Sequence, residues 1–101
     1  GFVPKKKSER EKLFLEISYS SKTTIFFESP YRLKKSLNEL KKIFGGLREI
    51  QVFRELTKKF EEHIGNNIND VIKYFENKEV LGEITIVIKG EKNITIKNKI
   101  W

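Results

Sequence analysis

Charged side chains gather at two points of the sequence, each directly after a short apolar run. The two clusters are Glu28 with Arg32, and Arg54 with Glu55, Thr57 and Lys58. Carboxylates and amines can transfer protons, and a guanidinium can hold a phosphate group through two parallel hydrogen bonds. Both clusters are therefore candidate sites for catalysis or anion binding. The plainer alternative for the first cluster is a surface ion pair between its two members.

The first cluster lies where a predicted strand passes into a predicted helix. Residues 23–27 are all β-branched or aromatic, which predicts a strand buried on both faces. Ser29 is a typical helix cap and Pro30 suits the first helical position, so we expect a helix over residues 30–44 that ends at a Gly-Gly pair. The first cluster would then flank the carboxyl end of a strand, where open α/β sheets place their ligand sites.

A second predicted strand, over residues 49–53, runs into the second charged cluster. The predicted helix between the two strands is a crossover, and such a connection usually joins parallel neighbours in one sheet. Parallel neighbours end at the same edge of a sheet. We therefore expect the two clusters to lie together at that edge.

The rest of the pattern completes an α/β fold with a mixed sheet of four to five strands and three helices. The further elements are helices near residues 8–19 and 67–77, and strands at residues 60–64, 83–89 and about 94–96. A capping box at Ser8 and Glu11 begins the first of these helices, and Asn66 or Asn67 caps the second. The last strand is expected at the edge of the sheet, antiparallel to its neighbour.

Length and composition indicate a single domain over residues 1–101 that was cut from a longer chain. The absence of cysteine excludes disulfides and thiolate metal sites, and one histidine, His63, cannot build a zinc site by itself. No apolar run approaches the roughly 20 residues of a membrane span. We expect a cytoplasmic protein that binds neither a metal nor a membrane.

The positive charge is concentrated in the first part of the chain. Residues 1–60 hold 15 Lys and Arg against 7 Asp and Glu, a net charge of +8, whereas residues 61–101 hold 6 against 7, a net charge of −1. A basic surface beside a neutral one is typical of proteins that bind a polyanion such as RNA. The alternative is a bias toward lysine in composition, with the lysines simply solvated on helix faces.

Three sequence blocks together resemble one family of enzymes. The blocks are residues 1–4 with 6–10, residues 25–33, and residues 54–58 with 61–62. In order and spacing they resemble the C-terminal half of the bacterial small-subunit ribosomal RNA cytidine 2′-O-methyltransferases, which are members of the tetrapyrrole methylase superfamily. The family usually has tyrosine and histidine where this chain has Phe27 and Tyr31, so the resemblance supplies no histidine base at position 31.

The resemblance implies a two-domain enzyme of the tetrapyrrole methylase-like (class III) fold, with S-adenosylmethionine held in the cleft between the domains. This chain would be the C-terminal domain, which forms one wall of the cleft and part of the surface for small-subunit ribosomal RNA. Alone, it is expected to be inactive. Homodimers are common for this fold.

The resemblance also implies roles for individual residues. Glu28, Arg32, Glu55 and Lys58 would be catalytic; Phe2, Pro4, Ser29 and Pro30 would bind the cofactor; Lys5, Lys6, Lys7, Arg10 and Arg54 would bind RNA. By residue type, a glutamate or a neutral lysine can accept the proton of a ribose hydroxyl, and the arginines suit phosphate contacts.

Two alternatives remain open. The order strand-helix-strand-strand-helix-strand over residues 22–89 is also that of a ferredoxin-like split βαβ unit, which would make the chain an RNA-binding module without enzymatic activity. The aromatic-rich signature of such modules is absent from the sequence. The other alternative is a methylase of acidic tetrapyrroles, in which arginines would bind the carboxylates of the substrate.

Overall fold

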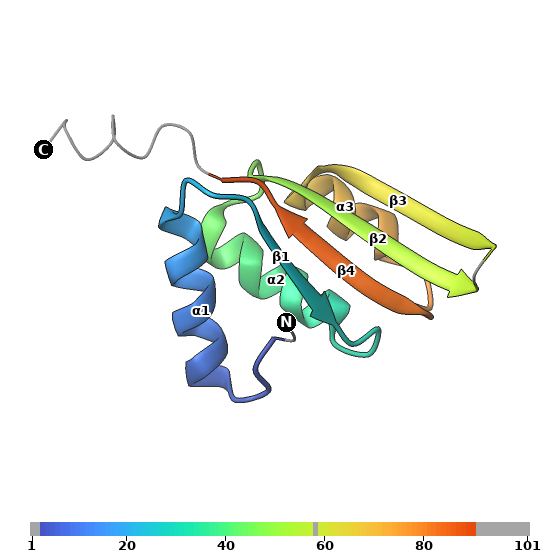
Figure 1. Cartoon of the computed structure of the whole chain (residues 1–101), viewed down its shortest axis with the longest axis horizontal. Coiled ribbons are helices and arrows are strands. Elements are labelled where there is room, and N and C mark those ends of the chain that lie inside the picture. Colours follow the sequence, from blue (N-terminus) through green and yellow to red (C-terminus); the bar gives the residue numbers. More distant parts are fainter. Residues whose placement is uncertain (1–2, 58, 91–101) are drawn as a thin grey trace, which may run out of the picture.

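The computed structural model describes residues 3–57 and 59–90 and shows two layers, a sheet and the helices packed on one of its faces (Figure 1). The elements in chain order are α1 (Lys7–Tyr19), β1 (Thr24–Glu28), α2 (Leu33–Phe44), β2 (Glu49–Thr57), β3 (Phe60–Asn67), α3 (Ile68–Phe75) and β4 (Glu83–Ile88). The expected three helices and α/β class are confirmed. The strand expected near residues 94–96 lies outside the described residues.

The sheet has the order β1-β4-β2-β3, and every neighbouring pair is antiparallel. The prediction that the first two strands are parallel neighbours was wrong, because β4 lies between β1 and β2. β1 and β2 are both antiparallel to β4, so they still run in the same direction and finish at the same end of the sheet. Glu28 and Arg54 are both opposite Ile84 in the register, which confirms that the two charged clusters share one end of the sheet.

This strand order also excludes the ferredoxin-like alternative. In a ferredoxin-like sheet the first strand is internal, with the fourth strand at the edge, whereas here β1 is at the edge and β4 is internal. The connectivity along the chain is the same in both cases. Only the long-range pairing of β4 between β1 and β2 distinguishes them.

The helices cover only one face of the sheet, and the alternation of side chains shows it. In β1, Phe26 and Glu28 are buried, whereas Ile25 and Phe27 are 58% and 43% exposed. The expectation of a strand buried on both faces was therefore wrong. On the uncovered side, Phe27, Thr85, Phe53 and His63 are opposite one another in a row across the four strands. We call this side the open face.

The core lies between the sheet and the helices. Leucines at helical spacing on α2 pack toward the inward-facing isoleucines of β4 and toward Phe75 of α3. α1 adds Phe14, whose ring centroid is 5.9 Å from that of Phe26. Gly45 ends α2 with φ of 84°, a left-handed conformation that glycine adopts without strain.

Two of the expected helix starts are corrected by the structure. α1 begins at Lys7, so Ser8 is inside the first turn and forms no capping box. α2 begins at Leu33 rather than at Pro30, because residues 30–32 form a turn that precedes the helix. The expected cap of α3 is confirmed, since Asn67 Oδ1 accepts a hydrogen bond from the backbone N–H of Asp70 at 2.9 Å.

Candidate functional site

A hollow of about 380 Å³ opens at the end of β1, beside the start of β4. Its lining comes from two short segments, residues 27–30 and 82–85. The segments meet because β1 and β4 are neighbours in the sheet. Three of the predicted site residues, Glu28, Ser29 and Pro30, line this hollow.

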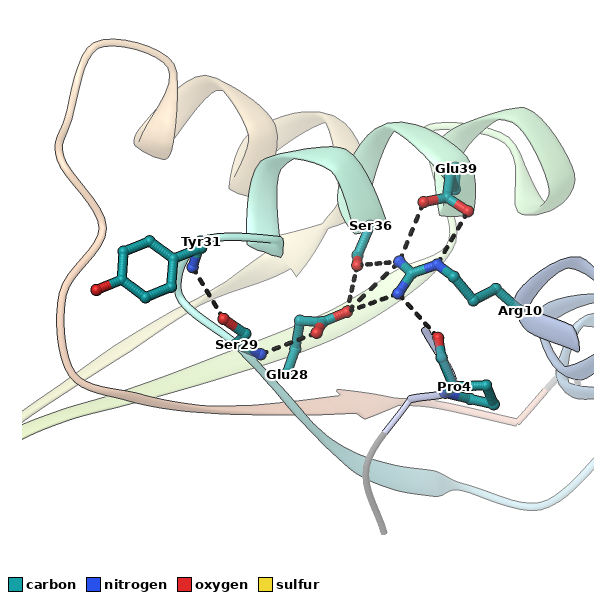
Figure 2. Close-up of polar contacts among 7 residues, drawn as sticks. All are labelled: Pro4, Arg10, Glu28, Ser29, Tyr31, Ser36 and Glu39. Atoms are coloured by element: carbon teal, nitrogen blue, oxygen red, sulfur yellow. Dashed lines mark hydrogen bonds and ion pairs between the residues drawn. The ribbon is translucent and has the colours of Figure 1, made fainter. Parts of the chain in front are cut away.

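Arg10 of α1 lies inside the domain, with 2% of its surface exposed. Figure 2 shows its guanidinium between α1, the end of β1 and α2. Nη2 donates to Ser36 Oγ at 2.5 Å, and Nη1 donates to the carbonyl oxygen of Pro4 at 3.2 Å. Nε and Nη2 donate to the two carboxylate oxygens of Glu39 at 3.3 and 3.0 Å, a bidentate pair. The expected RNA contact of Arg10 is thereby corrected, because the guanidinium is buried and engaged with protein groups.

The carboxylate of Glu28 lies in the same place, with 4% of the residue exposed. Its Oε1 accepts a hydrogen bond from the backbone N–H of Ser29 at 2.8 Å. Its Oε2 accepts from the hydroxyl of Ser36 and lies 3.5 Å from both terminal nitrogens of Arg10. The alternative of a surface ion pair between Glu28 and Arg32 is therefore wrong, and a carboxylate occupied in this way suits positioning better than proton transfer.

We call Arg10, Glu28, Ser36 and Glu39 the buried polar cluster. Ser36 and Glu39 were not among the site residues predicted from the sequence. Both Arg10 and Ser36 occupy positions on the apolar stripes of their helices, the first in register with Phe14 and the second between Leu33 and Leu40. A charged or polar residue on an apolar stripe is the sequence signal that would have indicated a buried polar contact.

The turn between β1 and α2 is held by Ser29 and presents two side chains to the outside. The hydroxyl of Ser29 accepts a hydrogen bond from the backbone N–H of Tyr31 at 3.2 Å, and its carbonyl accepts from that of Arg32 at 3.0 Å. Tyr31 is 93% exposed and points away from the buried polar cluster (Figure 2). A short turn held in this way places Tyr31 and Arg32 directly after Pro30, which lines the hollow.

Arg32 differs from the other three arginines. The guanidinium of Arg48 donates to the carbonyl oxygens of Ser18 and Lys89, while those of Arg10 and Arg54 pair with carboxylates. Among the residues that the structure describes, the side chain of Arg32 forms no hydrogen bond or ion pair. It is half-buried beside the N-terminus of α2, where the helix dipole does not favour a cation.

In the second charged cluster, Arg54 and Glu55 point to opposite faces of the sheet. Arg54 faces the helices, and its Nη2 lies 2.8 Å from Glu62 Oε1 on β3. Glu55 faces the open side, where it is opposite Glu83 and Glu61 in the register. Successive strand residues alternate in direction, so these neighbours in sequence cannot act on one substrate group together. The phosphate contact expected for Arg54 also competes with its ion pair to Glu62.

Glu62 links Arg54 to α3, and its contact with Tyr74 of that helix shifts the pKa of the tyrosine. The hydroxyl of Tyr74 donates to Glu62 Oε2 at 2.5 Å. This hydrogen bond, assisted by burial and by the negative charge of Glu62, raises the pKa of Tyr74 above 10.0, although Arg54 acts in the opposite direction. The fold favours the neutral phenol of Tyr74, so the hydrogen bond stabilises the folded state fully below pH 10. This stabilisation is lost as the pH rises through the higher pKa that Tyr74 has in the folded protein.

We therefore expect Tyr74 to ionise above pH 10.0 in an absorbance titration of the chain. The variant Tyr74→Phe should lose the absorbance change of that ionisation. A titration curve that is unchanged above pH 10.0 in Tyr74→Phe would contradict the assignment.

The remaining predicted residues fall into two groups. Lys5, Lys6 and Lys7 are exposed directly before or at the start of α1, and Lys7 Nζ lies 3.9 Å from Glu11 in a solvent-exposed pair. An exposed pair of this kind contributes little, so all three lysines remain available to an anion. Phe2 and Lys58 lie outside the described residues.

The described part of the chain has neither a metal-binding cluster nor a helix that could span a membrane. Residues 3–57 and 59–90 contain no group of three or more His, Asp or Glu side chains that could hold a metal ion. Within the same ranges, no helix combines the length and the apolar character that crossing a membrane requires.

Comparison with known proteins confirms the resemblance inferred from the three sequence blocks. The chain is 40% identical over 93 residues to ribosomal RNA small subunit methyltransferase I of Bacillus subtilis, a match that covers 92% of the chain and 32% of the relative. The proteins of the same name from Rickettsia prowazekii and Thermotoga maritima are 39% and 37% identical, over 98% and 91% of the chain and 34% and 40% of the relatives. The chain thus spans about a third of the length of these curated relatives. No family model matches it.

Proposed function

We propose that this chain is the C-terminal domain of an enzyme that transfers a methyl group from S-adenosylmethionine to a ribose 2′-hydroxyl of small-subunit ribosomal RNA. The observation that supports the proposal is the similarity, over nearly the whole chain, to proteins named as small-subunit ribosomal RNA methyltransferases. These names favour RNA over an acidic tetrapyrrole as the substrate. We place the complete enzyme in the cytoplasm, where ribosomal subunits are assembled.

The hollow at the end of β1 fits one side of a cofactor site. Its lining combines apolar side chains, those of Phe27 and Pro30 among them, with the backbone of the Ser29 turn and of the segment that begins β4. An adenine ring and the methylene groups beside a sulfonium need apolar walls with a few backbone polar groups, which is the usual lining of small-molecule sites. S-adenosylmethionine would supply an electrophilic methyl group when it is bound there. The facing wall would come from the remaining part of the enzyme.

The residues of this chain would orient the RNA rather than activate it strongly. S-adenosylmethionine would supply the methyl group to the ribose oxygen and leave as the thioether, and the hydroxyl proton would pass to a base or to water. Holding the reacting groups in line accounts for much of the rate of such a reaction. We assign Arg32 to an RNA phosphate near the hollow, with Glu55 and Lys58 as the candidate proton acceptors.

The exposed lysines lead to a prediction for the isolated chain. Lys5, Lys6 and Lys7 precede α1, and Lys34 and Lys35 extend from the first turn of α2 into solvent. Binding of a small-subunit RNA fragment should be weak, should show little sequence preference, and should weaken steeply with salt because counterions are released from the phosphates. Fluorescence anisotropy over a salt series measures this. An affinity that stayed constant between low and physiological salt would show that the lysines are only solvated.

We also propose that the complete enzyme forms homodimers through the part of the open face that lies away from the hollow. Ile25 and Phe53 are 58% and 42% exposed there, and exposed apolar side chains of this kind mark an interaction site. This part of the face therefore suits a second copy packed sheet against sheet. Sedimentation should show a dimer for the wild type and a monomer for Phe53→Glu. A dimer that survives this substitution, or a monomeric wild type, would contradict the assignment.

The proposed function can be tested in cells. Deletion of the gene for the complete protein should remove one ribose methylation from small-subunit ribosomal RNA, and its reintroduction should restore it. Sites of 2′-O-methylation resist alkaline hydrolysis, so the change can be mapped along the RNA. An unchanged methylation pattern would refute the proposal.

A further inference from the structure

The buried polar cluster joins three elements beside the hollow, at the end of the sheet where β1 ends and β4 begins. Arg10 comes from α1, Glu28 from β1, and Ser36 and Glu39 from α2 (Figure 2). We propose that the cluster is a positioning device, which sets the turn of residues 29–32 relative to the N-terminal segment and thereby sets the affinity for S-adenosylmethionine. The inference rests on the proposed function.

The contacts of Glu28 connect the cluster directly to the wall of the hollow. One carboxylate oxygen accepts the backbone N–H of Ser29, the residue whose hydroxyl and carbonyl hold the turn. The other oxygen is held by Ser36 and Arg10. A displacement of this carboxylate would therefore move the backbone that lines the hollow.

The contacts of Arg10 connect the same point to the start of the described chain. Its Nη1 donates to the carbonyl oxygen of Pro4 at 3.2 Å, and the preceding residue, Val3, donates its backbone N–H to the carbonyl oxygen of Phe27 at 3.3 Å. The N-terminal segment thus lies against the last residues of β1. One guanidinium fixes both this segment and the Ser29 turn, so the cluster holds together two backbone segments beside the hollow.

A role confined to stabilising the core explains the buried polar cluster less well than a positioning role does. A buried ion pair costs desolvation energy that its attraction only partly offsets, and well-packed apolar residues are often as stable in its place. A cluster of fixed hydrogen bonds instead holds the backbone segments that carry it in one relative position. Its four side chains are oriented by one another, with Ser36 Oγ accepting from Arg10 and donating to Glu28.

The test compares Ser36→Ala, which removes the bridging hydroxyl at constant charge, with Arg48→Lys in the complete enzyme. Arg48 also binds backbone carbonyls, those of Ser18 and Lys89, but at the opposite end of the sheet. We expect Ser36→Ala to raise the dissociation constant for S-adenosylmethionine about tenfold, the effect of losing a hydrogen bond to a charged group. Amide hydrogen exchange over residues 29–32 should become faster to a similar degree.

Arg48→Lys should lower the melting temperature and leave both the dissociation constant and the exchange at residues 29–32 unchanged. Arg10→Lys should behave like Ser36→Ala, because an ammonium group cannot reproduce the fork of contacts that the guanidinium makes. A Ser36→Ala enzyme with a lower melting temperature but unchanged affinity and unchanged exchange would overturn the inference. A wild-type enzyme that transfers no methyl group to RNA would refute the proposed function instead, and hydrogen exchange would still decide whether the cluster orders the turn.

Discussion

Replacement of Arg10 by alanine should lower the free energy of unfolding by about 3–5 kcal/mol, the usual cost of removing one partner from a buried ion pair. The side chains of Arg10 and Glu28 are 3% and 2% exposed, so the carboxylate would stay buried without its cation. Ser36 Oγ and the carbonyl oxygen of Pro4 would each lose a donor as well. The guanidinium also lies 5.6 Å from the centroid of the Phe14 ring, a cation–π contact that the variant loses.

Urea denaturation of the chain, followed by far-ultraviolet circular dichroism, gives this free energy directly. Lys7→Ala is the matched control, because Lys7 is on the same helix and its ion pair with Glu11 is 84% and 56% exposed at the two side chains. Exposed pairs contribute about 0–1 kcal/mol, so this variant should unfold near the wild-type midpoint. A loss of less than about 1 kcal/mol in Arg10→Ala would show that the cluster contributes no more than a surface pair.

Replacement of Arg32 by alanine should reduce the methyl-transfer rate of the complete enzyme about tenfold or more, which corresponds to roughly 1.4 kcal/mol of transition-state stabilisation. Arg32 lies on the turn beside the hollow, and its side chain has no partner among the described residues. A cation at the N-terminus of a helix gains nothing from the helix dipole. The fold therefore supplies no reason for an arginine at this position, whereas an RNA phosphate would.

The control for Arg32→Ala is Lys41→Ala, in the last turn of the same helix. Lys41 is exposed and lies far along α2 from the turn, so its removal should leave the rate near that of the wild type. Melting temperatures of both variants exclude unfolding as a cause. Equal rates for Arg32→Ala and Lys41→Ala would show that Arg32 has no part in the reaction.

The elements themselves could be predicted because local signals agreed with the final packing. The alternating residues of 83–88, the leucine stripe of α2 and the Asn67 cap each indicate one structure irrespective of their surroundings. The start of α2 was misplaced because Ser29 and Pro30 are suited to a helix start and to a turn alike. The tertiary position of Glu28, whose carboxylate accepts a hydrogen bond from the backbone N–H of Ser29 beside the hollow, decides in favour of the turn.

The candidate site was predicted only in part, for a reason that lies in distance along the chain. Glu28, Ser29 and Pro30 are consecutive, so their shared place at the hollow could be seen in the sequence. Arg10 meets Glu28 across 18 residues and Glu39 across 29, and no local pattern specifies such pairs. The antiparallel insertion of β4 between β1 and β2 is equally nonlocal, and it determines that Arg54 and Glu28 face the helices while Glu55 does not.

The most direct test of the proposed function is transfer from labelled S-adenosylmethionine to small ribosomal subunits by the complete enzyme, followed by digestion of the RNA to nucleosides. The label should appear in one 2′-O-methylated nucleoside, and for the family that this chain resembles that nucleoside is a cytidine. Label on a base, or transfer to a tetrapyrrole but not to RNA, would contradict the proposed function.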